Sequence, residues 1–504
     1  MLKSSDSVCF TSLLRIFATI VSLSGLLCLL RFVSNISFSE PLQLLTSGSE
    51  ELSFLSLWKF VHHQPVYTDP HKIPFSLSCF NWLFYVVYGM LTKAVLFFAR
   101  ISDPWIPTIG RLISLFFSVL GLIIARKTLV VLCRHPSKKM NLFFLLVPFY
   151  LFFGPLTAFW HLTARPDIAA VVFELLAFYI FIKEFENRPT RAALTATLFA
   201  FIAWSFKQVN ISVFLSLMIF CFIYYRRAAW MMGLMLASLC SLVVWLGGPD
   251  YRENAILFFP KSGFSNALVS KHFLYYIVQS LFAIPGYVAM GTVFFFKTFR
   301  DRILGEKKYQ FCFLTAVVTS LYGGATSQKI GASENYFIPA SIFAAFFCLL
   351  FLSDIVQDRI PKIFHISFYF SASINILVLL LILFGIKQHV SLRFQHKAYS
   401  ELLKCTESLP RPVFSQTPYL NLPWMLGGEN FVIVDQRLVG DEHKGVYERG
   451  GIRGLIREGY FATLLLDKGQ MTPRSAMDIP KEDLSHYVEQ LSTCPPTHLV
   501  FIRK

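Results

Sequence analysis

The chain has 504 residues, of which 55% are hydrophobic and 16% aromatic, and its mean hydropathy is +0.55. One soluble core could not bury that much apolar surface, so the composition excludes a soluble single domain and predicts an integral membrane protein. The formal net charge of +16 comes mainly from short basic segments between apolar runs, where Lys and Arg orient a chain and contact lipid headgroups, so nucleic-acid binding is not expected.

Eleven apolar stretches are long enough to cross a bilayer, which needs about 20 mostly apolar residues per helix. They begin near residues 12, 108, 141, 168, 192, 210, 228, 273, 309, 336 and 363, and a twelfth stretch, 81–99, is ambiguous. The first follows a basic start and lacks a small-residue cleavage pattern at its end, so we expect an uncleaved first helix. The sequence predicts a mostly α fold, a polytopic transmembrane bundle.

Basic clusters between these stretches predict the orientation of the chain. All of them are cytoplasmic only if the N-terminus is inside and segment 81–99 does not cross the membrane. That segment then lies flat at the outer surface, within a long first outer loop, 34–107, of surface-lying helices, and the second outer loop is 159–167. The clusters lie at 126–139, 183–191, 226–227, 297–308 and 359–362.

After residue 386 the apolar runs stop, and the rest of the chain carries turn signals and short apolar runs such as 431–434 and 499–502. We expect a transmembrane domain over 1–390 and a small α/β domain over 391–504, outside the cytoplasm. There Cys405 and Cys494 could form a disulfide, and two free buried thiols are the alternative. The ten cysteines include no CxxC, so neither a redox module nor a zinc module is expected.

Two adjacent carboxylates, Glu50 and Glu51, follow the first stretch. A carboxylate at the membrane surface can take the proton of an acceptor hydroxyl, and partial desolvation raises its pKa toward the working pH. The alternative is structural, because Ser47 and Glu50 have the spacing of a helix capping box.

The segment 58–71 is dense in groups that bind sugars, phosphates or metals, among them His62, His63 and Tyr67. Adjacent histidines point to different faces of a helix, so the pair does not form a two-ligand metal site by itself. A structural loop is the alternative for the histidines. Tyr67 suits a sugar face and a headgroup belt equally well.

The second outer loop contains His161, Arg165 and Asp167. The predicted topology places them at the same membrane face as Glu50 and Glu51. The alternative is that Arg165 snorkels to the interface and Asp167 caps the next helix.

Lys207 ends the fifth stretch on the outer side, and the loop before the tenth holds Lys329, Glu334 and Tyr336. Ionisable residues at membrane depth are expensive and indicate functional sites. A phosphate at the interface needs cations that offset its charge. The alternative is that the lysines are interfacial anchors.

Taken together, these features resemble the GT-C membrane glycosyltransferases, and most of all the family-39-like branch that includes protein mannosyltransferases and the aminoarabinose transferase of lipid A. The resemblance covers roughly residues 8–390. It rests on the acidic pair, an aromatic surface helix, Ala-Arg-Pro-Asp in the second outer loop, Lys-Gln at a span end, and a Lys-x-Gly-x-x-x-Asn-Tyr-Phe loop.

That family transfers a sugar from a polyprenyl or dolichyl monophosphate carrier to an acceptor at the outer face, with inversion. The resemblance implies that Glu50 or Glu51 is the base, in place of the usual Asp, and that Asp167 orients acceptor or metal. It places Arg165, Lys207 and Lys329 near the carrier phosphate. Further substrate-binding candidates are His62, His63, Tyr67, His161, Glu334 and Tyr336.

Some relatives bind a divalent metal through paired acidic motifs. Neither outer loop contains Asp-x-Asp, so no obligatory metal or other cofactor is expected.

The expected function is a single-displacement glycosyl transfer from a polyprenyl-phosphate sugar to a glycan, lipid or protein acceptor, in a bacterial inner membrane. The alternative from another class is a lipid or sugar transporter or flippase, which should show repeated halves and spans broken near the midplane. A non-catalytic carrier-binding protein of this fold, and a polymerase or ligase of surface polysaccharide, also fit the sequence.

Overall fold

The computed structural model of the chain describes residues 3–36, 50–133, 138–157, 160–257, 265–329, 332–355, 362–384, 401, 404–415, 421–426, 446–467, 479, 481–490 and 498–504. The chain divides into two compact units, each built from segments far apart in the sequence. The first comprises Met1–Val33, Arg111–Leu246 and Gly263–Ile386, and the second comprises Ser34–Gly110, Gly247–Ser262 and Lys387–Lys504.

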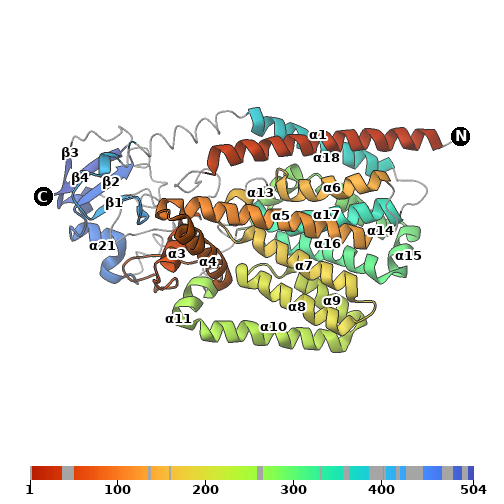
Figure 1. The fold of residues 1–504 in the computed structure, drawn as a ribbon, viewed down its shortest axis with the longest axis horizontal. Helices are drawn as coiled ribbons and strands as arrows, with labels where there is room; N and C mark the ends of the chain where they lie inside the picture. Colours follow the sequence, from red (N-terminus) through yellow and green to blue (C-terminus); the bar gives the residue numbers. More distant parts are fainter. Residues whose placement is uncertain are drawn as a thin grey trace. The chain divides into compact units, whose positions relative to one another are not determined.

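The first unit is a bundle of helices (Figure 1). Every stretch predicted as a span forms helix, but the eighth is two helices, α13 and α14, where we predicted one. The helices are α1 (Lys3–Asn35), α5 (Ile106–Leu132), α6 (Lys138–Phe153), α7 (Asp167–Glu184), α8 (Pro189–Phe206), α9 (Ser212–Tyr224), α10 (Arg226–Leu246), α13 (Asn266–Gln279), α14 (Ala283–Phe295), α15 (Lys297–Gly305), α16 (Lys307–Thr326), α17 (Ile338–Leu350) and α18 (Lys362–Phe384).

Among the described residues, six helices are long and apolar enough to cross a membrane, or seven if the bent pair α13–α14 counts as one span. Exposed apolar side chains such as Trp230 and Leu234 on α10, and Ile366 and Leu381 on α18, suit contact with lipid. The chain is therefore an integral membrane protein, whereas the predicted number of eleven spans is not confirmed. One of the six is Trp82–Ala99, so its predicted position flat on the surface stays a prediction.

Helix α7 lies inside the first unit, among α8, α9, α16 and α17 (Figure 1). The ring of Phe178 packs 5.0 Å from that of Phe311 on α16 and 4.8 Å from that of Phe343 on α17. Every residue of α17 is buried. Polar side chains on α7 are therefore held in a closely packed, apolar surrounding.

The chain bends by 98° between α13 and α14. The break exposes backbone groups, and neighbouring helices bond them: Tyr150 of α6 accepts from Leu281 N at 2.7 Å, and Ser371 of α18 donates to Leu281 O at 2.8 Å. Asn375 of α18 donates to the carbonyl of Val278 at 3.2 Å. Such partners make a broken helix tolerable at membrane depth.

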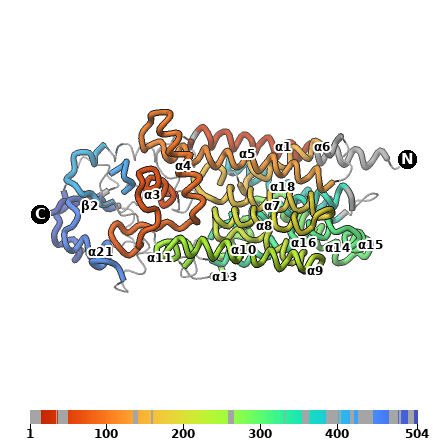
Figure 2. The backbone as a smooth tube through the Cα atoms, turned by 60° about the horizontal axis from the view of Figure 1, so that its bottom comes forward, coloured from red at the N-terminus to blue at the C-terminus, as the bar shows by residue number. Residues whose placement is uncertain are grey.

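The second unit contains α3 (Glu50–Val61), α4 (Trp82–Ala99), the short η1 (Asp103–Trp105), α11 (Gly248–Tyr251) and the π-helical η3 (Arg252–Leu257). Helices α3 and α4 lie side by side (Figure 2). Asn254 of η3 connects two parts of the loop between α3 and α4. Its side chain accepts a hydrogen bond from Ser78 N at 3.0 Å and donates one to the carbonyl of Thr68 at 2.8 Å.

The C-terminal part of the second unit holds a four-stranded sheet in the order β1-β2-β4-β3, which agrees with the predicted small α/β fold. Strand β1 runs parallel to β2, and the other neighbours are antiparallel. The elements are β1 (Val413–Ser415), η8 (Glu448–Gly450), α21 (Gly451–Arg457), β2 (Thr463–Asp467), η10 (Lys481–Leu484), β3 (Tyr487–Gln490) and β4 (His498–Arg503). The apolar run 499–502 is in β4, and the run 431–434 lies outside the described residues.

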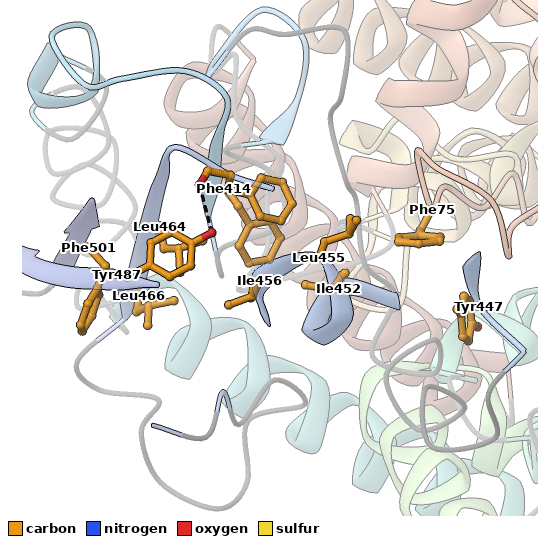
Figure 3. Packing of buried hydrophobic residues seen from close by; sticks show 11 residues of the cluster. Phe75, Phe414, Tyr447, Ile452, Leu455, Ile456, Leu464, Leu466, Tyr487 and Phe501 are labelled. Atoms are coloured by element: carbon orange, nitrogen blue, oxygen red, sulfur yellow. Dashed lines mark hydrogen bonds between the residues drawn. The ribbon is translucent and has the colours of Figure 1, made fainter. Parts of the chain in front are cut away.

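One hydrophobic core joins this sheet and α21 to the loop between α3 and α4 (Figure 3). Phe75 of that loop packs edge-on against Tyr447, with ring centroids 5.7 Å apart. Glu448 N donates to the carbonyl of His71 at 2.9 Å, and Ile73 N donates to the Glu448 carboxylate at 3.1 Å. The loop between α3 and α4 thus shares a core with the C-terminal part, and the domain boundary near residue 390 stays a prediction.

Cys405, in the same unit, is disulfide-bonded. The alternative of two free thiols is therefore wrong for Cys405. Its predicted partner, Cys494, lies outside the described residues.

A buried lysine links α3 to the loop that follows it. Lys59 Nζ donates to Ser76 Oγ at 2.7 Å and to Thr68 Oγ1 at 3.2 Å. Both partners are neutral, so burial lowers the pKa of Lys59 from 10.5 to about 8.

We expect the folded protein to gain stability as pH rises from about 8 toward 10.5. Below that window both states carry the charge, whereas within it the folded state has released a proton that the unfolded state retains. The gain from Lys59 is up to about 3 kcal/mol. Thermal unfolding in detergent across this range should therefore show a steeper rise for the natural chain than for Lys59→Met. Equal slopes would contradict the predicted role of Lys59.

Candidate functional site

Two acidic side chains lie on one face of α7. Asp167 begins the helix and Glu174 follows seven residues later, about two turns on, so both project to the same side. Both are buried, with 3% and 1% of their surface exposed. Carboxylates so deep in a membrane protein need hydrogen-bond or ionic partners.

Asp167 is held by three donors from different parts of the first unit. Arg165 Nε donates to Oδ2 at 3.0 Å, and Lys207 Nζ donates to Oδ1 at 2.5 Å. The side-chain amide of Asn335, in the short helix η4 (Glu334–Phe337), also donates to Oδ1. The two cations together carry one positive charge more than the carboxylate that joins them.

Aromatic rings cover both cations. The guanidinium carbon of Arg165 lies 4.8 Å from the ring centroid of Trp160, and Lys207 Nζ lies 4.6 Å from that of Tyr336. Cation–π contacts of this kind stabilise a desolvated cation. They orient Arg165 and Lys207 in addition to the hydrogen bonds that these two side chains donate to Asp167.

Glu174 binds the turn between α8 and α9. Its Oε2 accepts from Asn210 Nδ2 at 3.0 Å, and its Oε1 accepts from Ser212 Oγ at 2.9 Å and from Val213 N at 3.2 Å. The same turn begins at Lys207, the C-cap of α8. Helix α7 therefore holds the turn at both ends, through Asp167 at Lys207 and through Glu174 at residues 210–213.

A small cavity of about 20 Å³ lies between these two carboxylates. That is room for one or two waters and not for a sugar. Its walls come from α7, the 207–212 turn, α16, η4 and the start of α17. The lining residues are Asp167, Val171, Glu174, Lys207, Val209, Asn210, Ser212, Tyr322, Thr326, Asn335, Tyr336 and Pro339.

Four predicted residues of the first unit are not among the lining residues of this cavity: Arg165, described above, and Lys329, Glu334 and His161. Lys329 is buried, with 7% of its surface exposed, and Glu334 is half-buried beside Ser333. His161 is fully buried, with its ring nitrogens near the Cys28 thiol (3.3 Å) and the Thr157 carbonyl (3.2 Å).

The remaining predicted residues belong to the second unit. Glu50 and Glu51 form the first turn of α3 and are buried, with 0% and 4% of their surface exposed. A helix N-terminus favours negative charge. Ser47, the other half of the proposed capping box, lies outside the described residues.

The adjacent histidines have different partners. His62 Nε2 lies 2.9 Å from Asp103 Oδ2, and His63 Nε2 lies 2.7 Å from Lys93 Nζ. The Tyr67 hydroxyl donates to the carbonyl of Phe80 at 2.9 Å. Among the described residues, no group of three or more His, Cys, Asp or Glu side chains could hold a metal ion.

The sequence reasoning missed Glu174, Asn210 and Ser212, and it quoted Asn335 only as part of a motif. Glu174 had a readable signal, because it is an acid within an otherwise apolar stretch at a helical spacing from Asp167. The turn residues had none, since Asn and Ser after a span fit any loop.

No protein-family model matches the sequence, and no curated protein matches it. Solved structures do match. ArnT from Cupriavidus metallidurans is similar in its apo state (TM-score 0.55, 11% identity, 96% of this chain and 97% of that chain). The same protein bound to undecaprenyl phosphate is similar with a TM-score of 0.54 at 11% identity, over 96% of this chain and 98% of that chain.

The oligosaccharyltransferase of Archaeoglobus fulgidus, in complex with Zn and sulfate, is similar with a TM-score of 0.50 at 10% identity, over 92% of this chain and 71% of that chain. Both proteins have the GT-C fold. The chain described here has this fold as well, which confirms the fold predicted from its motifs.

Proposed function

We propose that this protein is a membrane glycosyltransferase that moves a sugar from a polyprenyl-phosphate carrier to an acceptor at the extracytoplasmic face. The observation that carries the proposal is the buried cluster of Arg165, Asp167 and Lys207, which holds two cationic side chains in fixed places where they suit a phosphate group. The fold shared with ArnT, which has been solved with undecaprenyl phosphate, supports the same donor class.

The proposed reaction is a single displacement. Glu50 or Glu51 takes the proton of the acceptor hydroxyl, whose oxygen forms a bond to the anomeric carbon as the bond from that carbon to the phosphate oxygen breaks. The carrier phosphate leaves with the electron pair, and Arg165 and Lys207 stabilise its charge. The configuration at the anomeric carbon is inverted.

Asp167 has a positioning role in this scheme. Its two oxygens already accept bonds from three side chains, two of them cationic, so it is a poor base. Its contribution is to hold Arg165 and Lys207 in fixed places before the substrate arrives, which lowers the reorganisation that charge stabilisation requires.

The disulfide at Cys405 supports a C-terminal domain outside the cytoplasm, because disulfides persist in oxidising compartments. With a cytoplasmic N-terminus this is the orientation that the basic clusters predict. We propose the inner membrane of a bacterium as the location, and a glycan, lipid or protein as the acceptor.

The broken pair α13–α14 favours the second candidate, a transporter or flippase, since discontinuous helices are typical of that class. However, the side chains that bond the break, Tyr150, Ser371 and Asn375, are neutral. They bond backbone groups and offer no charge to a phosphate. Transfer is therefore the better-supported function.

The test is sugar transfer from radiolabelled polyprenyl-phosphate sugars in membranes that contain the chain. We expect Glu50→Gln or Glu51→Gln to lower the rate by at least about 100-fold, the usual contribution of a general base, with donor binding retained. The other substitution should have a smaller effect. Because Arg165 and Lys207 offset the phosphate charge, the rate should be the same in EDTA.

If sugar transfer survives both substitutions, neither Glu50 nor Glu51 is the general base. Release of the intact donor on the opposite side of a vesicle, without transfer, would favour the flippase. Loss of the rate in EDTA, with recovery on adding a divalent cation, would show that the reaction needs a metal.

A further inference from the structure

A second cavity, of about 600 Å³, lies in the second unit where the end of α3 meets α4. It is lined by Phe60, His63, Gln64, Pro65, Met90 and Lys93. None of these residues is acidic, and three of them have polar side chains. The cavity is thus partly apolar and carries the positive charge of Lys93.

The charge is held in place by His63. Lys93 Nζ lies 2.7 Å from His63 Nε2, within hydrogen-bond distance, and an ammonium group can only donate in such a bond. An ammonium group has three N–H donors, and this bond uses one of them. A ligand that accepts hydrogen bonds and carries negative charge therefore suits this cavity.

The backbone directs His63 toward α4. His63 has φ of 58°, in the left-handed region, at the turn that follows α3, and Gln64 N donates back to the carbonyl of Lys59 at 2.8 Å. Such a conformation costs on the order of 1 kcal/mol for a residue other than glycine. Gly89 lets α3 approach α4, because a Cβ at this position would collide with the ring of Phe60.

The outer face of α4 beside the cavity is apolar. Lys93 lies three residues after Met90 and four before Phe97, so the three side chains are neighbours on the helix surface. Met90, Phe97 and Phe98 are exposed over 54%, 76% and 81% of their surface. A single cation on an exposed apolar helix face suits the boundary between acyl chains and headgroups.

We propose that this cavity binds the phosphate headgroup of an anionic membrane phospholipid, with its acyl chains along the exposed face of α4. Lys93 donates to the phosphate and His63 fixes the ammonium, while Gln64 adds a neutral donor. Phe60 and Met90 contact the glycerol end of the chains. This lipid site is inferred without use of the proposed transfer, so it holds whether or not the chain is a transferase.

The experiment is native mass spectrometry of the full-length protein in a neutral detergent, titrated with phosphatidylglycerol. Diacylglycerol with the same acyl chains serves as the ligand that lacks phosphate. We expect Lys93→Gln to weaken phosphatidylglycerol binding about tenfold, the loss of one charge-assisted bond, and Lys93→Arg to retain it within about threefold. Lys72→Gln is the matched control, because Lys72 is a well-exposed lysine of the same unit outside the cavity, and it should bind as the natural chain does.

Equal weakening of phosphatidylglycerol binding by Lys72→Gln and Lys93→Gln would overturn the proposal. It would show nonspecific electrostatic attraction of the lipid to lysines and no defined binding site. Diacylglycerol binding as tightly as phosphatidylglycerol would show an apolar contact only. Full displacement of the lipid by millimolar inorganic phosphate would identify a soluble phosphate compound as the occupant. Loss of binding in Lys93→Gln alone, with inorganic phosphate unable to compete, is the result that the proposal requires.

Discussion

Replacing Asp167 by asparagine should lower the rate of sugar transfer by about 100-fold or more and destabilise the fold. The substitution keeps the size of the side chain but leaves Arg165 and Lys207 buried without the negative charge that joins them. Breaking a buried ion pair by removing one partner costs about 3–5 kcal/mol. Rates per mole of folded protein and thermal unfolding midpoints, measured on the same preparation, give the two effects separately.

The double substitution Asp167→Asn with Lys207→Gln separates structure from chemistry. It restores the charge balance of the cluster, so the unfolding midpoint should move back toward that of the natural chain. Transfer should stay low, because the cation assigned to the phosphate is gone. Recovery of both stability and transfer would contradict a role for Lys207 in the reaction. Asp301→Asn, an exposed acid on α15, is the control that should change neither quantity.

The cluster on Asp167 shows what the sequence could predict. Arg165 and Lys207 were chosen because each is an ionisable residue beside an apolar stretch, where an unpaired charge is costly. Asp167 was chosen because the predicted topology and the family resemblance placed it at the same membrane face as Glu50 and Glu51. That reasoning identifies the members of the cluster. It could not predict that their main contacts are with one another, because the pairing of positions 167 and 207 depends on how α7 and α8 pack.

The break between α13 and α14 and the shared core of the second unit could not be predicted from the sequence for a related reason. The stretch from 273 was predicted as one span although Gln279 and Ser280 interrupt it, and the 98° bend is tolerated because Tyr150 and Ser371, far away in the chain, bond the freed backbone groups. Likewise, Phe75 reads as one more aromatic residue of a surface loop until Tyr447 is found against it. Hydropathy predicts helices well but says little about which side chains from distant parts of the sequence bond or pack against them.

We expect a strong effect on donor binding from Glu174, an acid that the sequence reasoning overlooked although it lies within an apolar stretch. Glu174→Leu removes the acceptor of three buried donors, from Asn210, Ser212 and Val213, each of which costs about 1–3 kcal/mol when left unpaired. The turn that begins at Lys207 should then shift. Since Lys207 is assigned to the carrier phosphate, the KM for the donor should rise about tenfold or more.

Glu174→Gln decides whether Glu174 acts through its hydrogen bonds or through its charge. The glutamine carbonyl can still accept from Ser212 and Val213, and Asn210 can turn its amide to present an oxygen to the new NH₂ group. If Glu174 positions the turn, this variant should keep kcat and KM within about threefold of the natural values while Glu174→Leu does not. If Glu174→Gln is as damaging as Glu174→Leu, the negative charge itself is required, and Glu174 interacts with the substrate or a proton and does more than brace Lys207.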